Sequence, residues 1–235
     1  KDLYDALNTG ASGRLPFLGT STKIEAGGSA GVLSAVLYMV PADLSGREAC
    51  SGRSDGCSAA CLAESTGKMS FPNAQRARRR RHASFYADRW RFLADLHAEV
   101  AKHERKAKRA GKAPAIRLNG TTDLPWHRMA YVGPDGVSYP SLHAAFPNVH
   151  FYEYTKRPRS LQGAIPSNLS LTFSLSERAD AEGYATEYLL AGHGVAVVAD
   201  HKRHVPPPTF SIGGASYPTL DGDAHDARFL DPASH

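Results

Sequence analysis

Five apolar segments of strand length recur along this chain, and helical or long polar segments separate them. They cover residues 32–40, 115–119, 149–154, 169–173 and 195–199. Strands separated by such long connections pair in parallel, because each connection returns the chain to the same end of the sheet. The length of 235 residues is one that α/β folds reach as a single unit. The sequence therefore predicts one α/β domain over residues 1–235, an open or partial α/β barrel with mainly parallel strands.

The connecting segments carry three predicted helices. Residues 73–82 suit a short helix, and residues 179–190 suit another. Between these two, apolar residues recur every three or four positions after Ser84, which can cap a helix that ends near Gly111. Residues 1–30 are rich in Gly, Ser and Thr, and we expect them to be loop-like.

The net charge of +5 is unevenly distributed along the chain. The basic helical segment 71–112 contains 13 Lys and Arg against 4 Asp and Glu, so it carries +9 and the remainder carries −4. Such a segment can attract nucleic acid or another polyanion, or it can be a solvated face that pairs with the acidic body. Guanidinium groups bind phosphate oxygens in pairs. The residues expected to contact nucleic acid or a host protein are Arg76, Arg78, Arg79, Arg80 and Arg81.

No apolar run reaches the roughly 20 residues that a membrane-spanning helix needs. No basic stretch precedes an apolar one at the start of the sequence, as it does in a signal peptide. We therefore expect a cytoplasmic protein with no membrane partner. The oligomeric state is not indicated.

All three cysteines, Cys50, Cys57 and Cys61, lie within twelve residues of one another. Thiolates are soft ligands that suit iron–sulfur clusters, zinc and Cu(I), and structural disulfides are rare in the cytosol. Glycines around the cysteines let a loop close on a compact centre. Because the CxxC pairs typical of structural zinc are absent from the sequence, we expect an iron–sulfur cluster, [4Fe-4S] or [3Fe-4S], with zinc as the alternative. In a cubane [4Fe-4S] cluster, three thiolates bind three of the four irons, so the fourth iron needs a ligand other than cysteine.

Polar residues follow several predicted strands at the point where each strand ends. They are Asn119, Asp123, Lys156 and Glu177. The carboxyl ends of parallel strands lie at one edge of a sheet, where the loops carry the site in α/β folds. The cysteine loop also follows a strand, so we expect it to share this edge with a substrate pocket lined by these four residues. Each polar cluster alone could also cap a helix or close a turn.

The segment Asp221-Gly222-Asp223-Ala224-His225-Asp226 places three carboxylates and an imidazole within six residues. Such a set can bind a metal, perform acid–base chemistry or supply a fourth cluster ligand. An Asx-rich turn before a short terminal helix also accounts for the aspartates. His225 is the member expected to act in catalysis, because imidazole titrates near neutral pH.

Six motifs, in order from about residue 20 to the end, resemble the "gene product 88" family of actinobacteriophages. They are the three cysteines, NAQRAR at 73–78, RLNGTTD at 117–123, FYEYTKRP at 151–158, LTFS at 171–174 and DGDAHD at 221–226. The resemblance implies a phage protein that acts in the host cytoplasm. It implies no particular reaction.

A three-cysteine loop after the first strand of a partial α/β barrel is also similar to radical S-adenosylmethionine enzymes. In those enzymes three thiolates hold a [4Fe-4S] cluster, and the fourth iron binds the methionine moiety. The spacing here is C-x6-C-x3-C, whereas theirs is usually C-x3-C-x2-C, and no glycine-rich methionine-binding stretch follows a second strand. The likeness implies S-adenosylmethionine as a further ligand.

Three functions are compatible with these features. The first is a phage iron–sulfur protein of unspecified reaction, either a radical S-adenosylmethionine-like or a redox enzyme, with the cluster at the carboxyl ends of the strands. The second is a metal-stabilised module that binds nucleic acid or a host protein through residues 76–81. The third is a cluster protein that has lost an ancestral activity and binds a host factor.

Overall fold

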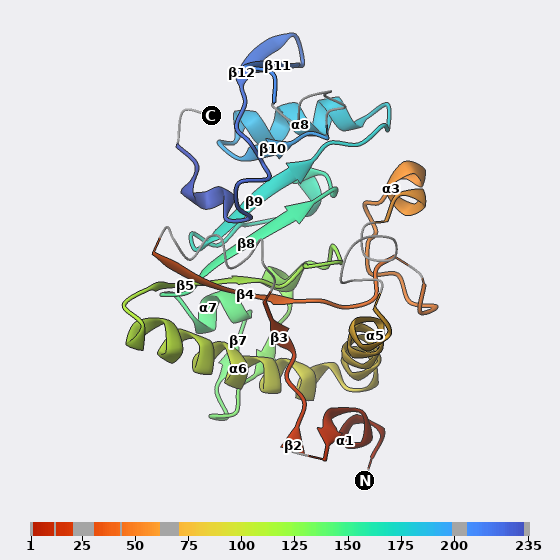
Figure 1. The fold of residues 1–235 in the computed structure, drawn as a ribbon, viewed down its shortest axis with the longest axis vertical. Helices are drawn as coiled ribbons and strands as arrows, with labels where there is room; N and C mark the ends of the chain where they lie inside the picture. Colours follow the sequence, from red (N-terminus) through yellow and green to blue (C-terminus); the bar gives the residue numbers. More distant parts are fainter. Residues whose placement is uncertain are drawn as a thin grey trace.

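A computed structural model describes residues 2–11, 13–20, 31–42, 44–61, 71–198 and 206–232. Its centre is a six-stranded sheet in the order β10-β9-β8-β5-β4-β3 (Figure 1). The strands are β3 (Leu18–Gly19), β4 (Val32–Leu37), β5 (Ala113–Arg117), β8 (His150–Thr155), β9 (Leu169–Ser174) and β10 (Gly194–Ala196). Strands β4 to β10 pair in parallel, and β3 is antiparallel to β4. The sheet is not closed, so the predicted open α/β arrangement with mainly parallel strands is confirmed.

Helices cover one face of this sheet. Helix α6 (Arg89–Arg109) lies against β4 and β5, and α8 (Ala181–Leu190) lies against β9 and β10. Each parallel strand pairs with the next one made by the chain, and right-handed crossovers then bring the connections to the same face. The main hydrophobic core lies between these layers and includes Phe92, Leu96, Val100, Ile116, Phe151, Phe173 and Tyr188.

Shorter elements complete the fold. The helices are α1 (Leu3–Asn8), α3 (Asp55–Ala59), α5 (Pro72–Ala87) and α7 (Leu142–Ala145), with 3-10 turns at Trp126–Arg128, Arg159–Leu161 and Arg228–Leu230. The two-stranded pairs are β1 (Thr9–Gly10) with β2 (Gly13–Arg14), β6 (Tyr131–Val132) with β7 (Ser138–Tyr139), and β11 (Thr209–Ile212) with β12 (Ala215–Pro218). No helix in the described part of the chain is long and apolar enough to cross a membrane.

The N-terminal segment differs from the predicted loop. The Asp2 carboxylate accepts a hydrogen bond of 2.9 Å from the Asp5 backbone N–H and so caps α1. Tyr4 and Asn8 are buried, and Arg80 of α5 donates a 2.7 Å hydrogen bond to the Asn8 side chain. The loop prediction is therefore wrong for α1, because tertiary contacts with α5 stabilise this short helix. Residues 21–30 lie outside the described part.

The boundary between the two long basic helices also differs from the prediction. Helix α5 extends to Ala87, and α6 begins after Asp88, whose carboxylate accepts a 3.0 Å hydrogen bond from the Arg91 backbone N–H. Ser84 is buried inside α5, where its hydroxyl donates to the Arg80 carbonyl. The predicted cap at Ser84 is therefore wrong. The end of α6 near Gly111 is confirmed, and Gly111 adopts a left-handed φ of 64° that favours glycine.

Two predicted strands are shorter than expected. Strand β4 ends at Leu37, and the three residues after it belong to the loop. Strand β10 ends at Ala196, although the apolar run suggested a strand to residue 199. Residue 199 itself lies outside the described part.

The C-terminal segment covers the other face of the sheet. Phe229 packs against Val32, Ala115 and Tyr152. Arg117 of β5 donates a 2.7 Å hydrogen bond to the Asp226 carboxylate, and both side chains are largely buried, at 19% and 10% exposed. This ion pair ties the DGDAHD motif to the central strands of the sheet.

We predict that Asp226→Asn lowers the free energy of unfolding by about 3 kcal/mol, because it leaves the Arg117 charge buried without its partner. Chemical denaturation followed by circular dichroism measures this loss. Asp221→Asn is the matched control, since the Asp221 side chain is exposed and its carboxylate accepts a hydrogen bond from the Asp223 backbone N–H. The control should change stability by less than about 0.5 kcal/mol. Equal losses in the two variants would contradict the structural role of the ion pair.

Candidate functional site

The cysteine loop lies beside the loop that follows β5. The Cys50 sulfur accepts a 3.2 Å hydrogen bond from the Ala42 backbone N–H and lies 3.8 Å from the Thr121 carbonyl. The Asp123 backbone N–H donates a 2.8 Å hydrogen bond to the Ala49 carbonyl. The first cysteine is therefore fixed at the carboxyl edge of the sheet, next to the polar cluster that follows β5.

The same loop is anchored on the ends of β8 and β9. The Glu177 carboxylate accepts hydrogen bonds from the Ser54 hydroxyl at 2.8 Å and the Gly56 backbone N–H at 2.7 Å. These bonds hold the first turn of α3, the helix that carries Cys57. A Cβ on Gly52 would lie 2.7 Å from the Lys156 carbonyl carbon, so only glycine allows this close approach. The loop therefore contacts the segments after β5, β8 and β9.

All three cysteines are free thiols of intermediate exposure. Burial raises the pKa of Cys50 to about 11; the Ala42 N–H opposes this rise, and the charges of Asp123, Cys57 and Cys61 add to it. Cys57 and Cys61 are therefore close enough to Cys50 to influence its pKa. Within the described ranges, no three His, Cys, Asp or Glu side chains are placed to hold a metal ion.

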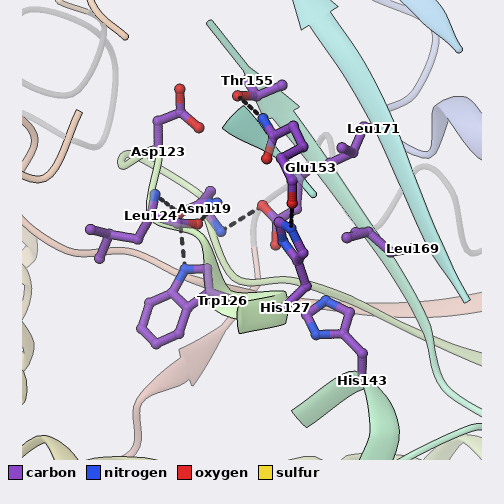
Figure 2. A pocket seen from close by; sticks show the side chains of 11 residues that line it. Asn119, Asp123, Leu124, Trp126, His127, His143, Glu153, Thr155, Leu169 and Leu171 are labelled. Atoms are coloured by element: carbon purple, nitrogen blue, oxygen red, sulfur yellow. Dashed lines mark hydrogen bonds between the residues drawn. The ribbon is translucent and has the colours of Figure 1, made fainter. Parts of the chain in front are cut away.

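Asn119 shapes the loop after β5. Its side-chain oxygen accepts hydrogen bonds of 2.9 Å from the Leu124 backbone N–H and the Trp126 indole N–H, as Figure 2 shows. It also accepts one of 2.9 Å from the Thr122 hydroxyl, and the amide N–H donates to the Leu124 carbonyl. The side chain is 5% exposed. These bonds fix the loop geometry and so position Asp123.

A small polar chamber lies beneath this loop, and Figure 2 shows the side chains around it. Its volume of about 10 Å³ is close to that of a single water site. Asp123 and Glu153 both line it, and burial raises the pKa of each carboxyl group, that of Glu153 to about 8. The Glu153 oxygens accept hydrogen bonds of 2.8 Å from the backbone N–H groups of Leu118 and Asn119. The end of β5 is thus held by a carboxyl group of β8.

Two histidines close the chamber on the side of α7. His127 shares a 2.8 Å hydrogen bond with the Gln162 carbonyl. His143 is 1% exposed, and neither ring nitrogen bonds a residue in the described part. Burial, with a contribution from the charge of His127, lowers the pKa of His143 to about 3. His143 is therefore neutral at physiological pH.

The predicted site residues fall into two groups. Asn119, Asp123, Lys156 and Glu177 lie together at the carboxyl edge with the cysteine loop. The Lys156 ammonium donates to the carbonyl and hydroxyl of Ser174, at 3.0 Å each. His225 belongs to the C-terminal segment instead, where its side chain lies 3.0 Å from Arg228 and 4.0 Å from Asp231.

The five arginines of the basic segment face in different directions. Arg78 is 2% exposed. Arg80 and Arg81 donate hydrogen bonds to the Pro16 carbonyl, and Arg81 also to the Tyr38 carbonyl. Arg76 and Arg79 are exposed. Of the five arginines, mainly Arg76 and Arg79 would therefore be available on this helix to contact nucleic acid or a host protein.

A family model described as Gene product 88 matches residues 15–235, almost the whole chain. The chain belongs to the Gene product 88 family. No curated protein and no solved structure matches it. The expected likeness to radical S-adenosylmethionine enzymes therefore gains no support. Both the cysteine loop and the polar chamber lie within the part that the Gene product 88 model covers.

Several chamber residues of this Gene product 88 chain were not predicted as site residues. Glu153 had a detectable signal, because it is a carboxylate within the otherwise apolar and aromatic run at 149–154. His127, His143 and Gln162 come from separate connections, and no local spacing links them. Only the fold brings these three side chains to one cavity.

We predict that the free energy of unfolding falls as pH rises from about 7.5 to 8.5. Glu153 has a folded pKa near 8 and an ordinary value of 4.5 when unfolded, so only the folded state keeps its proton in this range. Stability decreases with pH where the folded state binds more protons. Histidines whose pKa burial lowers, among them His127 and His143, act in the opposite direction near their ordinary value of 6.5, because only the unfolded state is protonated there; above about 7.5 they are largely neutral in both states.

Urea denaturation at several pH values measures this slope. Glu153→Gln should flatten it, because the glutamine carries no titrating proton. Glu187→Gln, at an exposed position of α8, should leave the slope unchanged. A slope that persists in the Glu153 variant would show that another group titrates.

Proposed function

We propose that this protein binds an iron–sulfur cluster through Cys50, Cys57 and Cys61 at the carboxyl edge of its sheet. The observation that carries the proposal is the anchoring of the cysteine loop on the ends of β5, β8 and β9. This edge is where α/β folds carry their sites. Under the resemblance to actinobacteriophage proteins, the protein would act in the cytoplasm of the host.

The donor set suits such a cluster chemically. Three free thiols supply the soft ligands that iron–sulfur clusters require. Burial disfavours the Cys50 thiolate in the protein alone, and a bound cation would favour it. Because no three-ligand set is already assembled in the described part of the chain, metal binding would draw Cys57 and Cys61 closer to Cys50.

Once bound, the cluster would supply one-electron chemistry or an iron site that takes a small ligand. Three cysteines leave one iron of a cubane without a thiolate. The charge of the Asp123 carboxyl group contributes to the raised pKa of Cys50, but one Asp123 oxygen already accepts a 2.9 Å hydrogen bond from the Lys156 backbone N–H. We therefore assign the fourth iron position to a small molecule, with S-adenosylmethionine as the first choice. A [3Fe-4S] form needs no such ligand.

The nucleic-acid-binding alternative has weaker support. Three of its five arginines point to the body of the protein, so the phosphate-binding surface is reduced to Arg76 and Arg79. In addition, Asp123, Lys156 and Glu177 converge on the cysteine loop. A metal with a purely structural role in a nucleic-acid-binding module would not explain this convergence.

We predict that protein purified without oxygen is brown, with broad absorption at ~400 nm from sulfur-to-iron charge transfer. Cys50→Ser, Cys57→Ser and Cys61→Ser should each lower the iron content at least ~10-fold. Ser51→Ala is the control, because Ser51 is an exposed residue of the same loop. A colourless protein, or one with one zinc ion per chain, would refute the proposal.

The assignment of the fourth iron has its own test. We expect S-adenosylmethionine, added to the reduced protein, to change the low-temperature electron paramagnetic resonance signal, because it would bind an iron that lacks a thiolate. Asp123→Asn should leave this change intact if the carboxylate is not a ligand. An unchanged signal in the wild-type protein would contradict S-adenosylmethionine as the ligand, while the iron content still reports on the cluster itself.

A further inference from the structure

A second cavity lies between α5 and the segment that leads from β4 to the cysteine loop. Its volume is about 380 Å³, within the range of sites for small ligands. The described residues that line it come from Val40 to Arg47 on one side and from Arg79 to Tyr86 on the other. None of the residues that hold the polar chamber or the cysteines lines this cavity.

Two arginines give the lining of the cavity a positive charge. Arg47 and Arg79 both line it, and both are exposed. Neither guanidinium forms an ion pair or a hydrogen bond with a residue in the described ranges. The Arg47 guanidinium lies 5.5 Å from the centre of the Tyr86 ring, which positions it by a cation–π contact. The described lining contains no carboxylate to neutralise this pair.

The arginines that follow Arg79 on α5 behave differently. Arg80 donates to the Asn8 side chain and the Pro16 carbonyl, and Arg81 donates to the Pro16 and Tyr38 carbonyls, so both side chains are held against the body of the protein. Arg79 alone of these three turns its side chain to the cavity. Of Arg79, Arg80 and Arg81, only Arg79 is therefore available to a ligand in the cavity, together with Arg47 from the opposite side.

The rest of the described lining is uncharged and contains two aromatic rings. His82 is 3% exposed, its ring nitrogen lies 2.5 Å from the Ser45 hydroxyl, and burial lowers its pKa. The Tyr86 ring lies 4.8 Å from the His82 ring, and the buried Val40 side chain lies beside them. This surface suits a planar or apolar group, while the two arginines suit an anion.

We propose that this cavity binds a small phosphate monoester, with the phosphate between Arg47 and Arg79 and its organic group against His82 and Tyr86. Paired guanidinium groups match the tetrahedral oxygens of phosphate, which accept two hydrogen bonds from each fork. The site is independent of the iron–sulfur proposal, because it uses no cysteine and none of the polar strand ends.

Isothermal titration calorimetry with phenyl phosphate tests this site on the full-length protein. Phenyl phosphate should bind more tightly than inorganic phosphate, and benzyl alcohol, which has the ring without the anion, should not bind. Arg47→Gln and Arg79→Gln should each weaken binding of phenyl phosphate at least ~10-fold, as expected for the loss of charged hydrogen bonds. Ala83→Trp should abolish binding by filling the cavity, since the exposed Ala83 lines it.

Arg76→Gln is the matched control, because Arg76 is an exposed arginine of the same helix that does not line the cavity. This variant should bind phenyl phosphate as the wild-type protein does. Circular dichroism would verify that every variant is folded. Equal losses from Arg76→Gln and Arg79→Gln would show general attraction to a basic helix and overturn the proposal, as would the absence of measurable binding at millimolar phenyl phosphate.

Discussion

Parallel strands β4, β5, β8, β9 and β10 pair in the order in which the chain makes them, and the rest of the structure depends on this pairing. Because every strand points the same way, the segments that follow β4, β5, β8 and β9 all leave the sheet at one edge (Figure 1). The cysteine loop meets Thr121, Lys156 and Glu177 for this reason alone. Residues separated by more than a hundred positions, such as Ser54 and Glu177, thus come into contact at one edge.

The same winding places α6 and α8 on one sheet face, and the C-terminal segment covers the other. An apolar contact at Phe229 and the ion pair of Arg117 with Asp226 hold that segment. Asp226 of the DGDAHD motif therefore has a structural role as the partner of Arg117. His225 of the same motif forms a hydrogen bond with the nearby Arg228. At the carboxyl edge, buried hydrogen bonds of Asn119 and Glu153 shape the loop below the cysteines. Asn119, a catalytic candidate from the sequence, therefore stabilises the loop that positions Asp123.

Most of the sheet and the convergence of the polar strand ends could be predicted from the sequence, because apolar runs and the residues that end them are local signals. The cap at Asp88 was missed because Ser84 is an equally good local candidate, and only its burial inside α5 excludes it. The inward orientation of Arg80 and Arg81 depends on Pro16 and Tyr38, which lie far away in the sequence. Such contacts are fixed by tertiary packing and leave no local pattern.

The central claim is that the three cysteines hold one iron–sulfur cluster at the carboxyl edge of the sheet. Iron and acid-labile sulfide, counted per chain in protein isolated under strict exclusion of oxygen, test it most directly. The account predicts about three or four iron ions with a similar number of sulfides per chain. Protein that contains neither, even after reconstitution with ferrous iron and sulfide, would contradict it.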